Sequence, residues 1–499
     1  MTLSLKSMQD TLKLLSAQVI IGIFSVVYFF IIALLFPKVE MAAIPVFSMI
    51  IGICSMLTGF GLTTTCVQKV PRFIAEGNKK DASNLIKASI ILPVILSLVL
   101  AFIVFLFSNY ISLIFFKTSE YSNLIKIMSI GIVSFKLNES LLLLIPATDR
   151  FGKLSLIRVL NGVFIPLFAL SFYFVLNIEG YIIGLICGYM LSSGLIIYYL
   201  RDFIFYKSEL GFHYVKNLVS YSIPYYLEGF MHYATNVDQF VIGIFLLPET
   251  LATYYVVRRF FDFLAKYNGV LTEPIVPKIA QIKNQGVEKI RRSFYMTSRY
   301  LSLALIPVCF LIASISYPLL QVFGGGKYIN GALTLSILAL SIIAYGLYSI
   351  YAMNVYVLGK PKLRLQQESV NGISNVILVF LLIKPLGIIG CALANFFSLF
   401  ISMFFSKHLL KRLVRVKFDT DTLKQTLFAS IVMSVIIILG QVIYYNILLI
   451  LIYVLIGGIL YLIITCRNLE KEDIDLIKSF LPKRFSFILR IVHLFGGKN

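Results

Sequence analysis

The chain has 499 residues, of which 59% are hydrophobic and only 13% are charged, and its mean hydropathy is +0.91. So few polar side chains cannot cover the surface of a soluble protein of this length, so lipid must be the solvent. The net charge of +21 lies in short basic clusters between apolar runs. This pattern indicates membrane topology and argues against a nucleic-acid partner.

Apolar runs of about 20 residues, bounded by charge or by Pro and Gly, predict about fourteen transmembrane helices. The segment before the first run lacks a small-residue cleavage site, so this run is expected to remain as a helix. The longest expected outer loop, near Asn109 to Glu120, has about a dozen residues and leaves no room for an outer catalytic domain. The expected spans are 11–36, 41–68, 85–108, 121–146, 154–176, 179–200, 217–247, 250–275, 293–318, 329–358, 365–384, 386–406, 422–445 and 447–466.

The distribution of basic residues between the loops sets the expected orientation. With the N-terminus inside, roughly 35 Lys and Arg residues are cytoplasmic and about five lie near outer ends. The sequence therefore predicts a multi-pass protein of the plasma or inner membrane with both termini in the cytoplasm.

An internal repeat supports the same layout. Short motifs recur in order at an offset of roughly 206 residues. They are Val70-Pro71-Arg72 with Val276-Pro277-Lys278, Asn161-Gly162 with Asn371-Gly372, and Gly180 to Gly184 with Gly387 to Gly390. Six helices separate the copies, so the repeat is expected to be parallel. The expected parts are a six-helix lobe 1–206, a six-helix lobe 207–412, two further helices 413–466 and a cytoplasmic tail 467–499, read as an amphipathic helix or a solvated segment.

Ionisable side chains inside spans are costly and therefore mark candidate functional positions. Helical spacing gathers two polar stripes, with a further acid–base pair in the fourth span. They are Tyr225, Glu228, His232 and the neighbouring Asp238 in the seventh span, Tyr255, Arg258, Arg259, Asp262, Lys266 and Glu273 in the eighth, and Lys136 with Glu139. The competing interpretation is that Lys136 neutralises Glu139, and that Asp262 neutralises Arg258 or Lys266. His232 fits a helix contact better than a metal ligand, and no motif predicts a cofactor or an enzyme.

The chain resembles the Wzx-type flippases of the multidrug/oligosaccharidyl-lipid/polysaccharide (MOP) exporter superfamily over nearly its full length. The resemblance rests on motifs at the ends of the expected helices. They are Val70 to Asn78, Asp238 to Gly243, Leu251 to Tyr254, Leu358 to Lys362 and Gly387 to Gly390. It implies an all-α integral membrane fold of two six-helix lobes in a V, as in MATE (multidrug and toxic compound extrusion) transporters, plus two C-terminal helices.

The resemblance also implies a function, namely alternating-access transport of a polyprenyl-pyrophosphate-linked oligosaccharide to the outer leaflet for cell-surface polysaccharide assembly. The basic candidates Arg258, Arg259, Lys136 and Lys266 would bind the pyrophosphate, and Tyr225 and Tyr255 would stack on sugars. The acidic candidates and His232 would line the cavity or couple transport to H⁺ or Na⁺. Membrane lipid and polysaccharide assembly proteins are the expected partners. One alternative is a cation-coupled exporter of amphipathic drugs from the same superfamily. Another is an oligosaccharide polymerase or ligase, although the short outer loops argue against such an enzyme.

Overall fold

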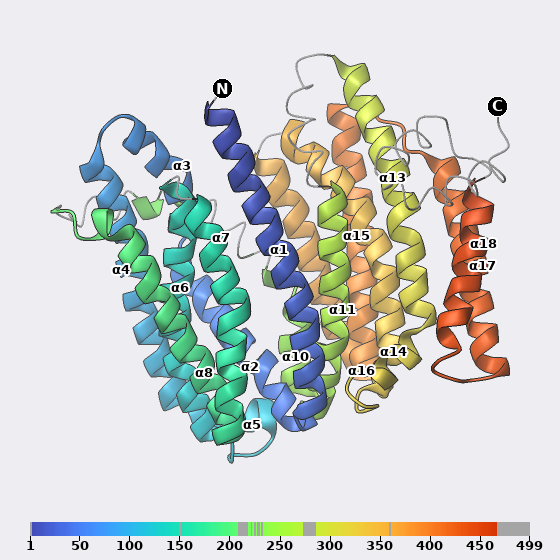
Figure 1. The fold of residues 1–499 in the computed structure, drawn as a ribbon, viewed down its shortest axis with the longest axis horizontal. Coiled ribbons are helices and arrows are strands. Elements are labelled where there is room, and N and C mark those ends of the chain that lie inside the picture. The colour runs from blue at the N-terminus through green and yellow to red at the C-terminus, as the bar shows by residue number, and fades with distance from the viewer. Residues whose placement is uncertain are drawn as a thin grey trace. The chain divides into compact units, whose positions relative to one another are not determined.

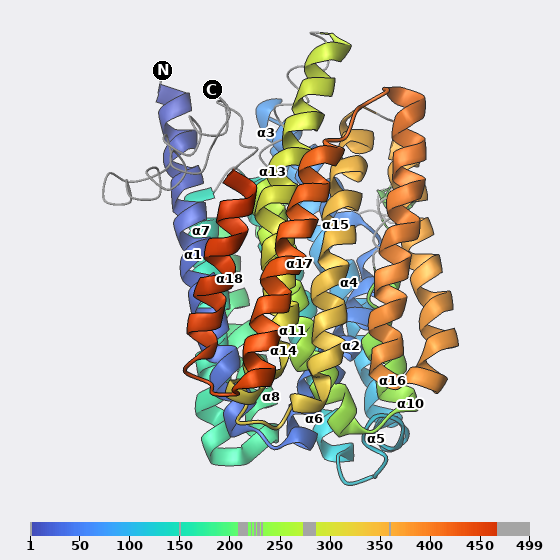
Figure 2. The same ribbon diagram turned by 90° about the vertical axis from the view of Figure 1, so that its right-hand side faces the viewer.

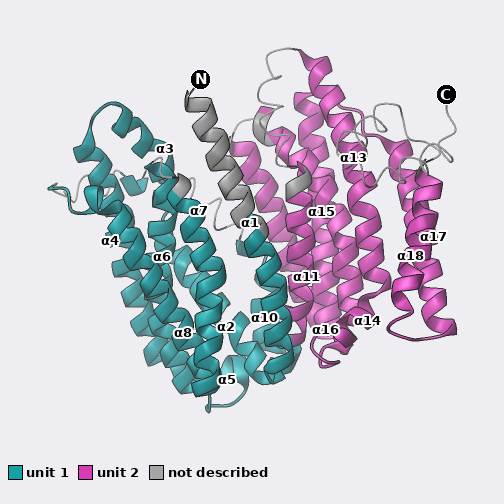
Figure 3. Cartoon of the chain, viewed as in Figure 1, with its two compact units in different colours: residues 1–252 teal, residues 253–499 magenta. Residues whose placement is uncertain are grey.

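The computed structural model describes residues 2–148, 151–207, 218–220, 222–223, 226, 230, 233–272, 286–358 and 361–466. Within these ranges the regular structure is entirely helical, which confirms the predicted all-α fold. Helices are expected in lipid because they satisfy every backbone hydrogen bond inside one segment. The chain divides into two compact units, residues 1–252 and residues 253–499 (Figure 3). The expected tail 467–499 lies outside the described residues.

The first unit is built around α6, which packs against both α4 and α8. A core of buried aliphatic side chains from α3, α4, α6, α7 and α8 fills this unit, with Leu85, Leu144 and Ile196 fully buried. The helices of the unit are α1 (Thr2–Leu35), α2 (Lys38–Gly59), α3 (Leu62–Ala75), α4 (Lys79–Leu106), α5 (Ser108–Phe116), α6 (Ser122–Ala147), α7 (Phe151–Val159), the π-helical η1 (Leu160–Phe164), α8 (Ile165–Ile204) and α10 (Val237–Phe245) (Figure 1). Helix α11 (Pro248–Thr272) begins here and continues into the second unit.

The second unit is built on the contact between α15 and α16 and on α13, which touches both α15 and α17. The last two helices, α17 and α18, lie side by side (Figure 2) and bury Met433 and Ile437 against α13. The helices of the unit are α13 (Val287–Ser314), α14 (Ser316–Val322), η2 (Ile329–Gly331), α15 (Ala332–Leu358), α16 (Pro361–Leu413), α17 (Thr420–Ile443) and α18 (Ile450–Cys466).

Two sharp turns share one geometry. Asn177 inside α8 has φ 51° and ψ −139°, and Gly387 inside α16 has φ 56° and ψ −134°. Three residues after each turn, Gly180 and Gly390 approach the preceding helix so closely that a Cβ would lie 2.1 Å from a backbone oxygen. Asn177 and Gly387, like Gly180 and Gly390, are 210 residues apart, close to the offset of the sequence repeat.

The turn in α8 closes an antiparallel helical hairpin. Gly184 and Gly188 follow Gly180 at intervals of four residues and lie on the same face of the helix. Gly184 approaches Ala169 and Gly188 approaches Ile165, so the two segments run in opposite directions. Small residues at a spacing of four let two membrane helices approach closely. The sequence predicted this break between its fifth and sixth spans, at the correct place.

Two predicted features of the first unit are corrected. The single span 41–68 is broken after α2, because Phe60 and Gly61 both adopt left-handed backbone geometry with φ of 44° and 67°. The expected outer loop near Asn109 to Glu120 contains α5 (Ser108–Phe116), whose apolar run is too short for a span but long enough for a two-turn helix.

Eight helices among the described residues are long and apolar enough to cross a membrane. Two of these, Lys153–Ile204 and Lys362–Leu413, contain 52 residues each and include the turns at Asn177 and Gly387. Each half of such a helix is long enough for a bilayer core of about 30 Å. The total of about fourteen spans stays a prediction.

Candidate functional site

In the first unit, Lys136 and Glu139 form the ion pair that their spacing on α6 predicted. Lys136 Nζ lies 2.9 Å from Glu139 Oε2. Ser55 of α2 completes the cluster, because Lys136 Nζ donates to its carbonyl oxygen at 3.1 Å and to its Oγ at 3.0 Å. The Ser55 hydroxyl donates in turn to Glu139 Oε2 at 2.5 Å. Gly59 leaves room for the ammonium group, since a Cβ there would lie 3.4 Å from Nζ.

This cluster encloses its cation and leaves its acid accessible. The Lys136 side chain is 6% exposed and all three of its N–H donors have acceptors close by, whereas the Glu139 side chain is 29% exposed. Only Oε2 of Glu139 is engaged by the described residues, so Oε1 remains able to accept a hydrogen bond. What this part of α6 presents outward is therefore a carboxylate oxygen.

A second polar network crosses the first unit from Asn138, which lies between Lys136 and Glu139 on α6. Asn161 Nδ2 donates to Asn138 Oδ1 at 3.1 Å, and Ser192 Oγ donates to Asn161 Oδ1 at 2.5 Å. Asn161 lies in η1, and the adjacent Gly162 packs so closely on α1 that a Cβ would lie 2.7 Å from Ile21. π-Helical turns are frequent at functional sites. In the sequence, Asn161 stands out only as part of the repeat, and no local pattern indicates this network.

In the second unit, the predicted stripe on α11 separates into a buried part and an exposed part. Arg258 is 5% exposed, its Nε lies 3.5 Å from Asp262 Oδ1, and its guanidinium carbon lies 4.3 Å from the centre of the Phe261 ring. The Asp262 side chain is 41% exposed. Of the two pairings that the sequence left open for Asp262, the structure forms the one with Arg258.

Arg259 and Lys266 are the exposed cations of α11. The Arg259 guanidinium lies over the ring of the buried Tyr255, 4.8 Å from its centre, and Arg259 Nη2 donates to the Tyr255 hydroxyl. This contact fixes the direction of the guanidinium. Lys266 forms no ion pair with any residue that the structure describes.

Two buried charged clusters of the second unit were missed. Glu368 of α16 is 5% exposed, lies 2.5 Å from Arg364 Nη2 and accepts from the Tyr348 hydroxyl at 3.2 Å. Arg299 of α13 lies 3.3 Å from Asp419, and their side chains are 5% and 3% exposed.

Asp419 also caps the N-terminus of α17. Its Oδ1 accepts from the backbone N–H of Thr422 at 3.1 Å, and its Oδ2 accepts from the Thr422 hydroxyl at 2.7 Å. Further along the helix, Ser434 Oγ donates to the Phe310 carbonyl, and Gln441 Nε2 donates to the Ser314 carbonyl. The contacts along α17 therefore fix it to α13.

The remaining candidates belong to the seventh expected span, apart from Glu273 at the end of the eighth. Asp238 is fully buried in the first turn of α10, where Oδ1 accepts from the backbone N–H of Gln239 at 2.9 Å. Tyr225, Glu228, His232 and Glu273 lie outside the described residues. Among the residues that are described, no three His, Cys, Asp or Glu side chains are grouped so that they could hold a metal ion.

Comparison with known sequences gives one family and two informative relatives. The model of a family described as polysaccharide biosynthesis protein matches residues 31–333. Agl15 of Haloferax volcanii, named a probable low-salt glycan biosynthesis flippase, is 25% identical over 224 residues, 45% of this chain and 46% of Agl15. The chain thus aligns with about half the length of that relative. A membrane protein of Methanocaldococcus jannaschii is 22% identical over 423 residues, 77% of this chain and 79% of that protein.

Comparison with solved structures identifies the fold. The lipid II flippase MurJ in an inward closed conformation superposes with a TM-score of 0.76 at 18% identity, over 90% of this chain and 97% of MurJ. An inward-facing MATE-family multidrug transporter of the MOP superfamily superposes with a TM-score of 0.60 at 15% identity, over 79% and 95% of the two chains. At these identities the likeness establishes the fold alone.

Proposed function

The chain belongs to the polysaccharide biosynthesis protein family, and from that premise we propose that it is a flippase for a lipid-linked oligosaccharide. Its family and its MurJ-like and MATE-like fold are those of multi-pass membrane transporters. The proposed cargo is an oligosaccharide on a polyprenyl pyrophosphate, moved by alternating access from the inner to the outer leaflet for cell-surface polysaccharide assembly. The proposed location is the plasma or inner membrane, with both termini in the cytoplasm.

The observation that carries this proposal is the exposure of Arg259 and Lys266 on a helix of a membrane transporter. A cation facing hydrocarbon is costly, so these side chains are expected to face a hydrated path. A guanidinium donates paired hydrogen bonds to phosphate oxygens, and an ammonium adds a point charge. Arg259 is directed by Tyr255, so we assign Arg259 and Lys266 to the pyrophosphate and Tyr255 to orienting Arg259.

The buried cations have a different role in this proposal. Lys136 and Arg258 are held in ion pairs, so we assign them to positioning Glu139 and Asp262 rather than to binding phosphate. The exposed oxygen atoms of Glu139 and Asp262 then accept sugar hydroxyl groups or bind the coupling H⁺ or Na⁺. The drug-exporter alternative has less support, because the matching family is that of polysaccharide biosynthesis proteins.

The test is transport by the full chain in vesicles. Purified protein would be reconstituted with a fluorescent polyprenyl-pyrophosphate disaccharide, and the label reaching the opposite leaflet would be measured by a membrane-impermeant quencher. We expect rapid reorientation that an excess of unlabelled lipid-linked sugar inhibits and that an amphipathic cationic dye does not. Reorientation no faster than in protein-free vesicles would contradict the proposal. Uptake of the dye without movement of the sugar lipid would favour the drug exporter.

A further inference from the structure

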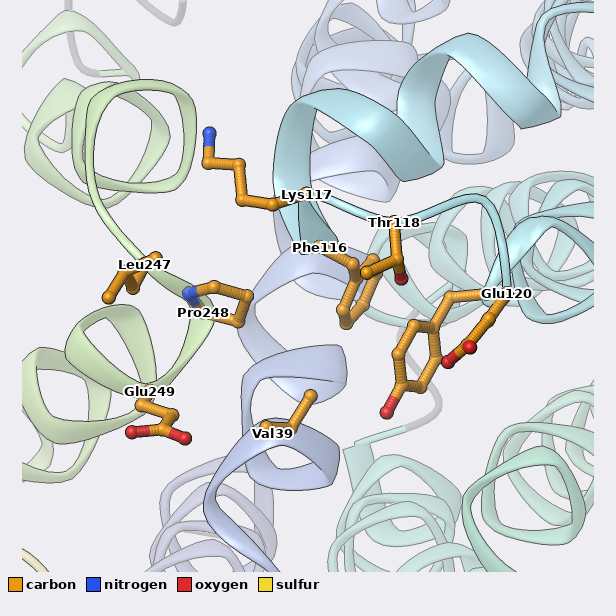
Figure 4. Close-up of a pocket in the computed structure, with 9 residues that line it drawn as sticks. Val39, Phe116, Lys117, Thr118, Glu120, Leu247, Pro248 and Glu249 are labelled. Atoms are coloured by element: carbon orange, nitrogen blue, oxygen red, sulfur yellow. The ribbon is translucent and has the colours of Figure 1, made fainter.

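A pocket of about 340 Å³ opens in the first unit between the turn after α5 and the turn that joins α10 to α11, and no member of the charged clusters lines it (Figure 4). Its volume is at the lower end of the range for small-molecule sites, which suits one or two sugar rings. The apolar side chains Val39, Phe116 and Pro248 lie between two acidic ones, Glu120 on one side and Glu249 on the other (Figure 4). The proposed topology places these turns on the outer side of the membrane.

Lys117 joins the two segments that border this pocket, the end of α5 and the end of α10. Its backbone has φ 61°, and its Nζ donates to the carbonyl of Ile114 at the end of α5 and to that of Ile244 at the end of α10, at 2.6 and 2.7 Å. Desolvation lowers the pKa of Lys117, and the two carbonyl oxygens accept from two of its three N–H donors. Beneath this contact, Gly243 of α10 lies so close to Phe115 that a Cβ would be 2.7 Å from the ring. The pocket is therefore built on two helices that are fixed to each other.

The electrostatic character of the pocket is negative. The side chains of Glu120 and Glu249 are exposed, and Lys117 is the only lining residue of opposite charge among those that border the pocket. Burial, followed by the charges of Glu40 and Glu120, raises the pKa of Tyr121, whose ring stacks on Phe116 with centroids 4.4 Å apart. The partly exposed ring of Tyr121, backed by the buried Phe116, offers a surface for C–H groups, and the neighbouring carboxylates offer acceptors for hydroxyl groups.

We propose that this pocket binds a neutral or amino-bearing sugar residue of the glycan after it reaches the outer side, and that it excludes uronic acids. A pyranose ring presents C–H groups on its faces and hydroxyl groups at its edge, which match the apolar side chains and the flanking carboxylates. A sugar carboxylate would be repelled by Glu120 and Glu249, because like charges at close range are unfavourable in a partly desolvated site. This inference rests on the proposed function for the source of the sugar.

The test is saturation-transfer NMR on the full chain in lipid nanodiscs, with glucose, glucosamine and glucuronate as the probes. We expect signal transfer to glucose and glucosamine and none to glucuronate. The double variant Glu120→Gln, Glu249→Gln should weaken binding of glucosamine by about tenfold, because each charge-assisted hydrogen bond is lost. Glu179→Gln is the matched control, because Glu179 is also exposed and is expected on the same side, outside the pocket. Equal transfer to all three sugars, or no change in the double variant, would overturn the proposal.

A second pair of variants tests the aromatic surface separately. Tyr121→Ala should reduce the signal from glucose, whereas Tyr110→Ala should not, because Tyr110 is an exposed tyrosine of α5 outside the pocket. The vesicle assay distinguishes this inference from the proposed function. Sugar binding in a chain that does not reorient the lipid would contradict only the flippase. Reorientation without sugar binding would contradict only the pocket.

Discussion

Helices α6 and α11 carry ion pairs of almost the same design, but the two pairs differ in what surrounds them. Lys136 and Glu139 are three residues apart, Arg258 and Asp262 are four apart, and each cation has a side chain only 6% exposed. In α6 the cation is held at 2.9 Å by its acid and by two further contacts to Ser55 of another helix. In α11 the acid lies 3.5 Å from its cation. In both helices the acid and the cation belong to the same helix.

This difference shows that the spacing of two charged residues along a helix does not by itself determine the role of their ion pair. The cluster on α6 joins two helices and presents an acid, with no exposed cation among its members. The cluster on α11 has the exposed Arg259 and Lys266 as neighbours and therefore presents positive charge. In the proposed mechanism, α11 binds the pyrophosphate and α6 offers an acceptor to hydroxyl groups or to a coupling ion.

The largest expected effect is on stability, at Lys136. Among the described residues, Lys136→Met leaves Glu139 with Ser55 as its hydrogen-bond partner. Breaking a fully buried pair costs about 3–5 kcal/mol, and the loss here should lie toward the lower end because Glu139 is 29% exposed. We expect a large fall in the thermal unfolding midpoint in detergent. The variant Lys136→Met, Glu139→Gln should recover much of the loss, because no uncompensated charge remains. An unfolding midpoint unchanged in the single variant would show that this cluster does not join α2 to α6.

A smaller effect is expected on transport, at Arg259. Arg259→Ala should slow reorientation of the pyrophosphate-linked lipid by about tenfold or more, because paired hydrogen bonds to phosphate are lost. Arg259→Lys should retain part of the transport rate, because the lysine ammonium keeps the positive charge but not the paired hydrogen bonds. The matched control is Arg201→Ala, since Arg201 is likewise exposed and likewise lies 4.8 Å over a tyrosine ring, that of Tyr198, but lies on α8. Equal losses in the two alanine variants would remove Arg259 from the proposed site.

The sequence predicted the features that depend on neighbours along the chain. Apolar runs located the helices, and the break between the fifth and sixth spans coincided with the turn at Asn177. The pairs Lys136–Glu139 and Arg258–Asp262 were the competing interpretation of the sequence, and they could be named because residues three and four apart share a helical face. The division of α2 from α3 also had a local signal, two glycines flanking Phe60, which the hydropathy pattern overrode.

The features that sequence analysis missed depend on contacts between distant segments. Arg299 and Asp419 are 120 residues apart, and neither belongs to a stripe that would indicate a partner. Exposure is equally non-local, because Arg258 and Arg259 are adjacent in sequence but one is buried by the packing around α11 and the other is not. The basic candidates could therefore be identified from the sequence, but the separation of ligands from positioning residues could not.

The smallest expected effect on stability is at Asp262, and it sharpens the comparison most directly. Asp262→Asn removes an acid that is already 41% exposed and 3.5 Å from its partner, while Arg258 keeps the Phe261 ring 4.3 Å from its guanidinium carbon. The Asn side-chain oxygen can still accept a hydrogen bond from Arg258, so the loss should be about 1–2 kcal/mol, below that of Lys136→Met. The vesicle assay should show slower transport, because the proposal gives Asp262 an acceptor oxygen for sugar hydroxyl groups or for a coupling ion. Transport retained at the full rate would show that Asp262 only balances Arg258.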